Sequence, residues 1–532
     1  MKQIINEINY NALQMQLPLD FTFSFEKDIA KDDVSRSVIE VAEEVNINNY
    51  VNLSNRDSHG YDGVMMFKLV VLSRTLFGRV STRELSSLCR NDLRFIFIAQ
   101  GQKPSHQSFQ RFISDDLKMS VEDIFFDINK YIETKIEINK DVLFIDGTKY
   151  EANANKNTFI WRKNTIKNRE KCWKKAISLI QRINRFCEKE NINVRYSLLR
   201  EPSIDYLLCI SDKIEDYMKD NHIEFVHGKG KRKSSIQKLY DELKNITLKM
   251  WEYTIHLDML NGRNSCSKTD PDATFMHMKY DYYNHTNVFK PGYNVQIGVS
   301  DGFIRNIYVS SDCNDLKTYI PFMEKYKQAY GNLPSKTPAD AGYGSYDNYS
   351  YCKENNIDLY MKHSGYYKDK EKTNDKNRFQ TKHLERSEDG GFICPAGHAF
   401  EVEKEVEDSR SIYKKVNTIY VNKHCEGCPL RSQCTKSKTG RTINHCHQLE
   451  EFHKEVNNNV TSKEGIELMH KRSNETEGTF GDWKANHNIE KLRYRGETGV
   501  RMELILIAIG HNIRKYHQIK MKLEQSKVQQ AN

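Results

Sequence analysis

Residues 293–311 read YNVQIGVSDGFIRNIYVSS, and this stretch does most to define the architecture of the 532-residue chain. Two runs with apolar residues at alternate positions are joined by Asp301 and Gly302. An Asp-Gly pair between two such runs is a strong signal for a β-hairpin with a two-residue turn. Upstream, the segment DVLFID (141–146) has the β-branched and aromatic composition of a strand and ends in an acid. We therefore expect an antiparallel hairpin and a strand that carries Asp146.

The segments around the hairpin extend this pattern. DLKTYIPFMEKYKQAYG (315–331) is predicted to be a helix, and TPADAGYGS (337–345) a strand that runs through Asp340 into a glycine-rich turn. From about residue 462 the chain is again predicted to be helical. This order matches a ribonuclease-H-like α/β core, with an antiparallel hairpin on one side of the sheet. The expected catalytic domain comprises residues 138–160, 265–362 and 462–520.

Two insertions interrupt this core. Residues 161–262 have apolar positions spaced alternately three and four apart, as in Ile236, Leu239, Leu243 and Ile246, which predicts an antiparallel helical insertion. Residues 391–446 hold a cluster of cysteines. The sequence therefore predicts a core with one long helical insertion and one cysteine-rich insertion.

Residues 1–125 are predicted to form a helical N-terminal domain that binds DNA. STRELSSLCRNDLRFIFIA (81–99) and QKPSHQSFQRFISDD (102–116) give a helix, a break and a second helix, an order that resembles a helix-turn-helix. A plain helical bundle is equally compatible with the composition. The candidate DNA-binding residues here are Arg83, Arg90, Arg94 and Arg111.

The overall composition narrows the functional classes. The chain has 81 Lys and Arg against 72 Asp and Glu, a net charge of +9, which fits a polyanionic partner. It shows neither an apolar run long enough for a membrane span nor the apolar core of a signal peptide. We therefore expect a cytoplasmic, nucleoid-associated protein. The sequence also contains neither a P-loop nor a dinucleotide-binding glycine motif, which speaks against an ATP-driven enzyme.

Four cysteines predict a structural zinc site. Cys425 and Cys428 form a C-x2-C knuckle, and Cys394 and Cys434 complete a set suited to one tetrahedral Zn²⁺. The insertion would then resemble a zinc ribbon. Packed thiols or a redox pair are the alternatives. Other candidate ligands nearby are His398, His424, His445 and Cys446.

Asp146 and Asp340 are the candidate catalytic acids. Each ends a predicted strand and precedes small residues, which lets a substrate backbone come close. Carboxylates at neighbouring strand ends can hold a pair of divalent ions, the arrangement used to cut and rejoin phosphodiesters. Acids are also common at strand ends for structural reasons, so their positions alone leave both interpretations open.

Four long segments resemble one protein family. They are GYDGVMMFKLVVLSRTLFGRVSTREL (60–85), DGTKYEANANKNTFIW (146–161), ADAGYGSYDNY (339–349) and NETEGTFGDWKANHNIEKLRYRGETGVRMELILIAIGHNIRK (474–515). In this order they are similar to the DDE insertion-sequence transposases of the IS1182 type, relatives of the IS4/IS5 group. The resemblance implies a ribonuclease-H-like catalytic domain, two Mg²⁺ or Mn²⁺ ions and double-stranded DNA as partner, both inverted-repeat ends and target. It also implies a homo-oligomer that works on paired ends.

The last of these segments supplies the third acid. In IS4-type enzymes the motif is Tyr-x2-Arg-x3-Glu-x6-Lys, and Glu477 and Lys484 have its Glu-x6-Lys spacing. Arg472 is one residue out of register, and the tyrosine is missing. On an α-helix Glu477 shares a face with Phe480 and Lys484, whereas Glu475 points away, so Glu477 is the expected third ligand of the Mg²⁺ ions.

Arg493 and Arg495 follow as candidate DNA-backbone contacts, together with Arg472. The expected function is a DNA transposase that cleaves and joins the ends of its own element. A non-catalytic, domesticated DNA-binding protein and a metal-dependent nuclease are the alternatives.

Overall fold

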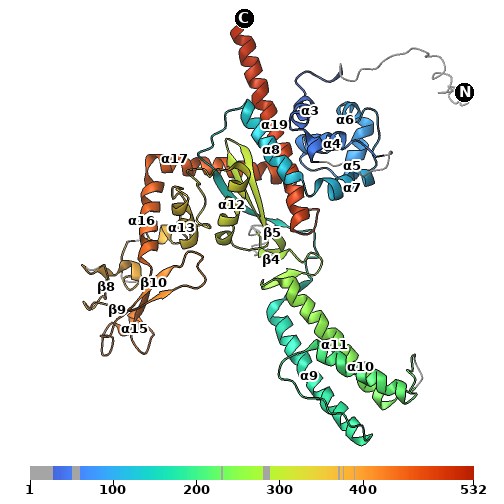
Figure 1. The fold of residues 1–532 in the computed structure, drawn as a ribbon. Helices are drawn as coiled ribbons and strands as arrows, with labels where there is room; N and C mark the ends of the chain where they lie inside the picture. Colours follow the sequence, from blue (N-terminus) through green and yellow to red (C-terminus); the bar gives the residue numbers. More distant parts are fainter. Residues whose placement is uncertain are drawn as a thin grey trace, which may run out of the picture. The chain divides into compact units, whose positions relative to one another are not determined.

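The computed structural model describes residues 28–50, 60–228, 232–278, 288–369, 372–374, 377–388 and 390–531 (Figure 1). These form two compact units. One comprises the described residues up to Ile138 together with those from Ile505 onward, and the other comprises Asn139–Leu504. The fold is mixed α/β. Among the described residues, no helix is both long and apolar enough to cross a bilayer.

The first unit is helical. Its elements are α3 (Val34–Glu44), η2 (Ile47–Asn49), α4 (Gly63–Phe77), α5 (Thr82–Asn91), α6 (Leu93–Ile98), α7 (His106–Arg111), η3 (Phe112–Leu117), α8 (Val121–Lys135) and the C-terminal part of α19 (Glu497–Ala531). Ser81 and Glu84 form a capping box at the start of α5, and Ser105 caps α7. The predicted first segment, 81–99, is divided at Asp92 into α5 and α6, and α7 follows the predicted break.

The apolar α4 and the C-terminal helix form the centre of this unit. Eleven of the fifteen residues of α4 are buried, as expected for a helix that is apolar on all sides. Gly510 of α19 lies so close to α4 that a Cβ there would be 2.6 Å from the backbone of Arg74. Asn512 of α19 donates a hydrogen bond of 2.7 Å to Asn129 of α8. The end of the chain is thus bound into the N-terminal helices.

The second unit is organised around β5 (Phe289–Ser300). This strand pairs antiparallel with β1 (Phe144–Glu151) on one edge, and with β4 (Thr274–His277) and β6 (Phe303–Ser310) on the other. The hairpin β5–β6 is confirmed. Its turn residues Asp301 and Gly302 have φ of 50° and 77°, the positive values that a tight type I′ turn requires.

The strand with Asp146 differs from the prediction in its bounds. It was expected to end at Asp146, but β1 begins at Phe144 and continues to Glu151, so Asp146 lies near its start. The polar continuation GTKYE has weak strand propensity. Each of its residues pairs with β5, and this ladder overrides the local preference.

Two short segments lie next to the start of β1. Residues 336–339 form parallel bridges to Val142 and to the segment 358–361. The amides of Leu143 and Ile145 each donate 3.0 Å hydrogen bonds, to the carbonyls of Lys336 and Pro338. The predicted strand before Asp340 is therefore present only as isolated bridges. Pro338 lacks the N–H that a regular ladder would need.

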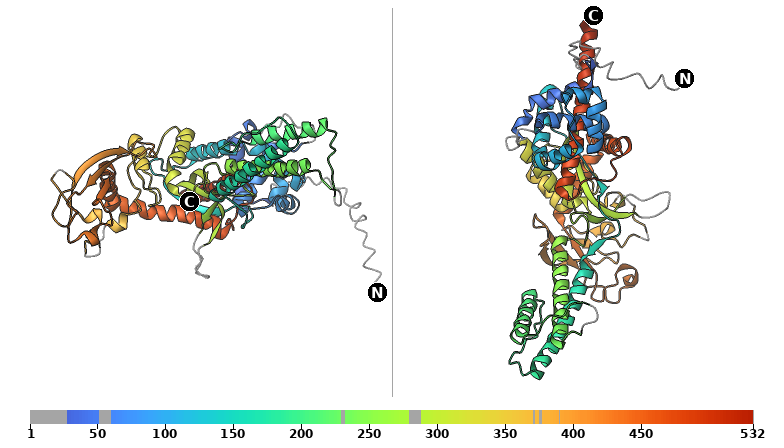
Figure 2. Two further views of the ribbon diagram at one scale, coloured as in Figure 1. Left: turned by 90° about the horizontal axis from the view of Figure 1, so that it is seen from below. Right: turned by 90° about the vertical axis from the view of Figure 1, so that its right-hand side faces the viewer.

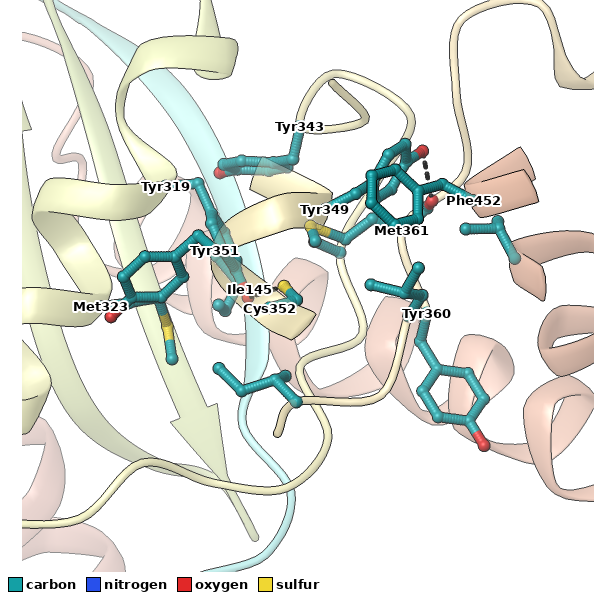
Figure 3. Packing of buried hydrophobic residues seen from close by; sticks show 14 of the residues in the cluster. Ile145, Tyr319, Met323, Tyr343, Tyr349, Tyr351, Cys352, Tyr360, Met361 and Phe452 are labelled. Carbon is teal, nitrogen blue, oxygen red and sulfur yellow. Dashed lines mark hydrogen bonds between the residues drawn. The ribbon is translucent and has the colours of Figure 1, made fainter. Parts of the chain in front are cut away.

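A tyrosine-rich core lies beside the sheet (Figure 3). Ile145 of β1 packs there with Tyr319 of α12 (Tyr319–Tyr330), Tyr349 of α13 (Tyr346–Glu354) and Phe452 of α16 (His447–Thr461). The hydroxyl of Tyr349 donates a 2.9 Å hydrogen bond to the carbonyl of Met361. This core holds β1 and the segments before Asp340 and after Asp358 in place.

The helical insertion contains α9 (Arg162–Lys189), α10 (Ile204–Asp220) and α11 (Ser235–Leu260), which lie side by side (Figures 1 and 2). Their apolar faces share one core. The predicted antiparallel helices correspond to α9 and α11, whereas α10 was not predicted. The strands β2 (Phe159–Trp161) and β3 (Ser265–Ser267) pair antiparallel at the two ends of the insertion.

The cysteine-rich insertion is built from short elements. They are β7 (Glu385–Arg386), β8 (Phe392–Ile393), β9 (Glu401–Glu407), β10 (Val416–Val421), α15 (Arg431–Cys434) and β11 (Thr442–His445). The strand order in its three-stranded sheet is β11–β10–β9. The remaining elements of the unit are η4 (Asp315–Lys317), α14 (Tyr366–Asp369), η5 (Thr381–His383), α17 (Lys463–Arg472), η6 (Ser473–Glu477), α18 (Gly478–Gly481), η7 (Asp482–Asn486) and the start of α19.

Candidate active site and cysteine cluster

The structure brings Asp146 and Asp340 together. Asp146 projects from β1, and Asp340 follows the segment that is hydrogen-bonded to the start of β1. Each carboxylate accepts a hydrogen bond from a glycine amide, Gly147 at 2.8 Å and Gly342 at 2.7 Å. Burial raises the pKa of both carboxyl groups, and the charge of Asp340 raises the pKa of Asp146 further. The pair therefore lies close enough to interact, in a poorly solvated position.

Arg472 is the cation next to this pair. Its Nη1 lies 3.4 Å from Oδ2 of Asp146, and its side chain is only 13% exposed. Burial raises the pKa of Asp146 and Asp340, whereas the guanidinium lowers both. The Nε of Arg472 is buried and has no hydrogen-bond partner among the residues that the structure describes. Arg472 was expected to contact DNA, and the structure pairs it with the first acid.

The segment after Arg472 contains two π-helical turns, η6 and η7, on either side of α18. A π turn closes with hydrogen bonds between residues five apart, so such residues come onto one face. Arg472 and Glu477 are five apart. In the motif Arg-x3-Glu the two residues are four apart, which suits an α-helical turn. The spacing of five between Arg472 and Glu477 suits a π turn in the same way.

The same turns change the environment of the two candidate glutamates. Glu477 is exposed, whereas the buried Thr476 donates a 3.2 Å hydrogen bond to Oδ2 of Asp146. Glu475 accepts a 2.5 Å hydrogen bond from the amide of Gly302 at the hairpin turn. The structure thus brings Thr476, rather than either glutamate, into contact with Asp146.

Lys484 reaches the same strand. Its Nζ donates a 2.6 Å hydrogen bond to Oγ1 of Thr148 and lies 5.0 Å from the centre of the Tyr150 ring. Alternate residues of a strand share a face, so Asp146, Thr148 and Tyr150 point to the same side of β1. Lys484 therefore lies along the face that carries the first acid.

A third carboxylate, Asp315, was missed. Its Oδ1 accepts hydrogen bonds from the side-chain amides of Asn294 at 2.7 Å and Gln296 at 3.0 Å. Burial raises the pKa of Asp340, and the charge of Asp315 raises it further. A Cβ at Gly342 would lie 2.9 Å from Asp340 and 3.1 Å from Asp315, so both carboxylates flank this glycine.

The sequence did contain one signal for Asp315. Asn294 and Gln296 are polar residues inside an otherwise apolar strand, and both are buried. Buried amides need partners, which indicates a polar site against this strand. Asp315 itself, an acid in the first turn of a helical segment, has an ordinary structural explanation in the sequence.

The predicted DNA-contacting arginines differ in their surroundings. Arg83, Arg90 and Arg111 are exposed on α5 and α7. Arg94 instead forms two hydrogen bonds with the carboxylate of Asp92, at 3.0 and 2.7 Å.

The two later arginines, Arg493 and Arg495, are also exposed. Arg495 donates a 2.8 Å hydrogen bond from Nε to the carbonyl of Asn153.

The four predicted cysteine ligands line one small pocket. They are Cys394, Cys425, Cys428 and Cys434. Three N–H groups point at their sulfurs. The amide of His398 lies 3.4 Å from Cys394, and Arg441 contacts Cys425 through its amide at 3.4 Å and Cys434 through Nη1 at 3.2 Å.

Of the alternative zinc ligands, His424 lines the same pocket, whereas His445 and Cys446 line a separate groove beside α16. Across the part of the chain that the structure describes, no three His, Cys, Asp or Glu side chains form a ready ligand set for a metal ion. Among these described residues, neither the acids of the candidate active site nor the cysteines of the insertion form such a set.

Comparison with protein-family models matched part of the chain. A family model described as the transposase DDE domain matches residues 393–517. Comparisons with curated proteins and with solved structures gave no match. The matched segment includes the four cysteines, Arg472 and Lys484, and it supports a DDE transposase, an enzyme class that acts on DNA and typically uses divalent metal ions. Asp146 and Asp340 precede it.

Proposed function

We propose that this protein is a DNA transposase of the IS1182 type. It would bind the terminal inverted repeats of its element and catalyse metal-dependent cleavage and strand transfer. One observation carries the proposal. Asp146 and Asp340, far apart in sequence, interact beside Arg472, which comes from the segment that matches the DDE domain. Lys484 from the same segment lies along the same face of β1.

The strand arrangement supports a ribonuclease-H-like core. The order β6–β5–β1 is antiparallel, and the bridged segments 336–339 and 358–361 continue from β1 in parallel. Asp146 on the central β1 and Asp340 at the end of the neighbouring segment are the positions from which two carboxylates can reach one place. We propose this layout for the catalytic core.

The chemistry of these side chains fits a divalent cation. Asp146, Asp340 and Glu477 would hold two Mg²⁺ or Mn²⁺ ions, since hard cations take carboxylate oxygens. When bound, such ions activate a water or a 3′-hydroxyl and stabilise the leaving oxygen. Burial disfavours the charged form of both aspartates, and a bound cation would offset this cost.

The other side chains have separate roles in this proposal. Lys484 would hold a phosphate of the DNA through a charge-assisted hydrogen bond. Arg472 balances the charge of Asp146 until the cations bind. Asp315, fixed by two buried amides, orients the turn at Gly342 and thereby Asp340.

For the cysteine-rich insertion we propose one structural Zn²⁺ held by Cys394, Cys425, Cys428 and Cys434. The support is that all four thiols line one pocket and that three N–H groups point at their sulfurs. Such contacts stabilise thiolate ligands. A site closed by four cysteines leaves no coordination position open, so it would support the fold and take no part in the chemistry.

The exposed Arg83, Arg90 and Arg111 would contribute to binding of the inverted repeats, with Arg493 and Arg495 as further backbone contacts. The protein would act without ATP, as a homo-oligomer on paired ends.

The test is an assay of the purified full chain with Mg²⁺, using linear DNA that carries the ends flanking its gene and a plasmid target. Cleavage at the ends followed by joining to the plasmid is the expected result. Cleavage without joining would identify a metal-dependent nuclease, and end-specific binding without cleavage a DNA-binding protein. Without binding or cleavage of these ends, the proposal is wrong.

A further inference from the structure

Five aromatic rings form a cluster where the helical insertion joins the sheet. They are Phe159 and Trp161 of β2, Phe275 and His277 of β4, and Phe289 of β5. We refer to them as the ring cluster. Phe275 lies 4.9 Å from Phe159, 5.0 Å from Trp161 and 5.1 Å from Phe289 between ring centroids, and His277 lies 5.0 Å from Phe289. The rings therefore form one continuous group.

The strand geometry explains this grouping. Phe159 and Trp161 are two residues apart on β2, and so are Phe275 and His277 on β4, so each pair faces one side. His277 pairs directly with Phe289 across the ladder between β4 and β5.

The cluster is open to solvent at its ends. Trp161 is 40% exposed and Phe289 is 48% exposed, while Phe275 between them is half-buried. Grouped apolar side chains that remain exposed commonly mark a binding surface. Planar aromatic faces are suited to stack on another flat ring system.

A row of positive charge begins directly after Trp161. The first half of α9, residues 162–175, has seven Lys and Arg and a single Glu. Lys163, Lys167, Lys171 and Lys174 are spaced four, four and three residues apart, so they share one face of the helix. All four are exposed. We refer to them as the basic stripe, which extends over roughly 16 Å at 1.5 Å per residue.

Among the three helices of the insertion, only α9 carries this excess of basic residues. The neighbouring α10 has five acids and two lysines in its seventeen residues. The two helices pack on one core but carry excess charge of opposite sign. The basic stripe is therefore complementary to a polyanion that lies along α9 and reaches the ring cluster.

We propose that the ring cluster and the basic stripe bind single-stranded DNA. The inference rests on the proposed function, which makes DNA the substrate, and it specifies the form of DNA that this surface holds. Exposed rings can stack only on bases whose faces are open, and in a duplex neighbouring base pairs cover them. The lysines contact the backbone of the same strand, while the rings stack on its bases.

The test is fluorescence anisotropy of labelled poly(dT) with the full chain, without divalent ions so that no cleavage occurs. Replacing both Trp161 and Phe289 by Ala should weaken binding of poly(dT) at least about tenfold, since each base–ring stack contributes about 1–3 kcal/mol. Trp161→Phe should retain binding because it keeps an aromatic face. The matched control is Trp251→Ala, since Trp251 is a 51% exposed tryptophan on α11 outside the ring cluster.

The basic stripe is tested separately. Lys163→Glu combined with Lys167→Glu should weaken binding and make it less sensitive to salt, because fewer counterions are released. Lys213→Glu on the acidic α10 is the control for a changed surface charge. The double variant of Lys163 and Lys167 (the stripe variant) should bind a fully duplexed oligonucleotide more weakly than the unaltered chain. The double variant of Trp161 and Phe289 (the ring variant) should bind this duplex almost as tightly as the unaltered chain.

The outcomes distinguish this inference from the proposed function. If the ring variant binds poly(dT) as tightly as the unaltered chain, or loses single-stranded and duplex DNA equally, the inference is wrong, whether or not the chain cleaves its ends. If the unaltered chain binds poly(dT) through the ring cluster but neither binds nor cuts the end DNA, the inference holds and the proposed function fails.

Discussion

The acid site and the cysteine cluster depend on their surroundings in opposite ways. Asp146 and Asp340 directly follow Ile145 and Ala339, which belong to a core of large buried side chains from β1, α12, α13 and α16. Figure 3 shows part of this core. In the cysteine-rich insertion, Cys394 packs against a core of five buried residues among those described, and every residue of β9 in the same sheet is exposed. The first site can be held by the fold around it, whereas the second has little core of its own.

This difference predicts opposite energetic roles. Burial raises the pKa of Asp146 and Asp340, so the folded chain disfavours their charged forms and must compensate through its core. A metal held by four thiolates would instead contribute folding free energy to a region with few apolar contacts. If both proposals hold, the acid site would lower stability in exchange for function, and the cysteine site would supply stability.

The largest expected effect concerns the acids. Asp340→Asn, or Asp146→Asn, should reduce cleavage of end-containing DNA by about three orders of magnitude, because each loses a metal-binding charge worth several kcal/mol in the transition state. Binding of the ends, measured by gel shift, should change little. Asp358→Asn is the matched control, since Asp358 is an exposed acid on the adjacent bridged segment. Cleavage by Asp340→Asn above a tenth of the unaltered rate would rule out the metal assignment.

Much of this site could be predicted from local sequence. The Asp-Gly turn and the helix after Asp315 follow from short-range patterns. Short-range patterns left the role of Asp146 and Asp340 open, and the resemblance to the transposase motifs selected these two acids and Lys484. The pairing of Arg472 with Asp146 and the place of Asp315 could not be predicted, because they depend on contacts between segments far apart in the chain. The contact of Thr476 with Asp146 was not predicted, because the sequence analysis assumed an α-helix where the chain forms a π turn.

The second effect is on the cysteine-rich insertion. Cys425→Ser combined with Cys428→Ser should abolish binding of about one Zn²⁺ per chain and unfold residues 391–446 locally. Metal analysis and limited proteolysis would show loss of zinc and new cleavage confined to this segment. Cys209→Ser, at an exposed thiol on α10, is the control. If the unaltered chain, purified under reducing conditions without chelators, contains no zinc, the metal site does not exist and the contrast with the acid site fails.

A smaller effect separates the two candidate third acids. Glu477→Gln should lower cleavage about a hundredfold at saturating Mg²⁺. Glu475→Gln should lower it about tenfold or less, since Glu475 accepts a hydrogen bond from the amide of Gly302 and Gln retains an acceptor. The comparison tests the proposed metal site directly, because Glu477 is exposed and would have to turn inward to bind the metal. If instead Glu475→Gln abolishes cleavage and Glu477→Gln remains active, the assignment is reversed.

The smallest expected effect is on thermal stability. It tests whether the acid site lowers the stability of the folded chain while the cysteine site raises it. Asp340→Asn should raise the midpoint of thermal unfolding by about 2 °C at neutral pH in Mg²⁺-free buffer. Burial, reinforced by the charge of Asp315, raises the pKa of Asp340 in the folded chain. Between the ordinary and the raised pKa, the folded chain binds the extra proton, so stability falls as pH rises through that interval. Asn at position 340 does not ionise, so the variant does not lose stability as the pH rises through this interval.

The gain in stability should be absent below the ordinary pKa of Asp and complete above the raised one. Asp146→Asn should give no such gain, because it leaves the largely buried Arg472 without its charged partner at 3.4 Å. The cysteine double variant should shift the unfolding of its own segment in the other direction. Two results would contradict this prediction: an effect of Asp340→Asn that is the same at every pH, or a variant that is less stable than the unaltered chain. Either result would mean that the buried charge of Asp340 does not destabilise the folded chain. In that case the difference between the two sites lies only in their cores.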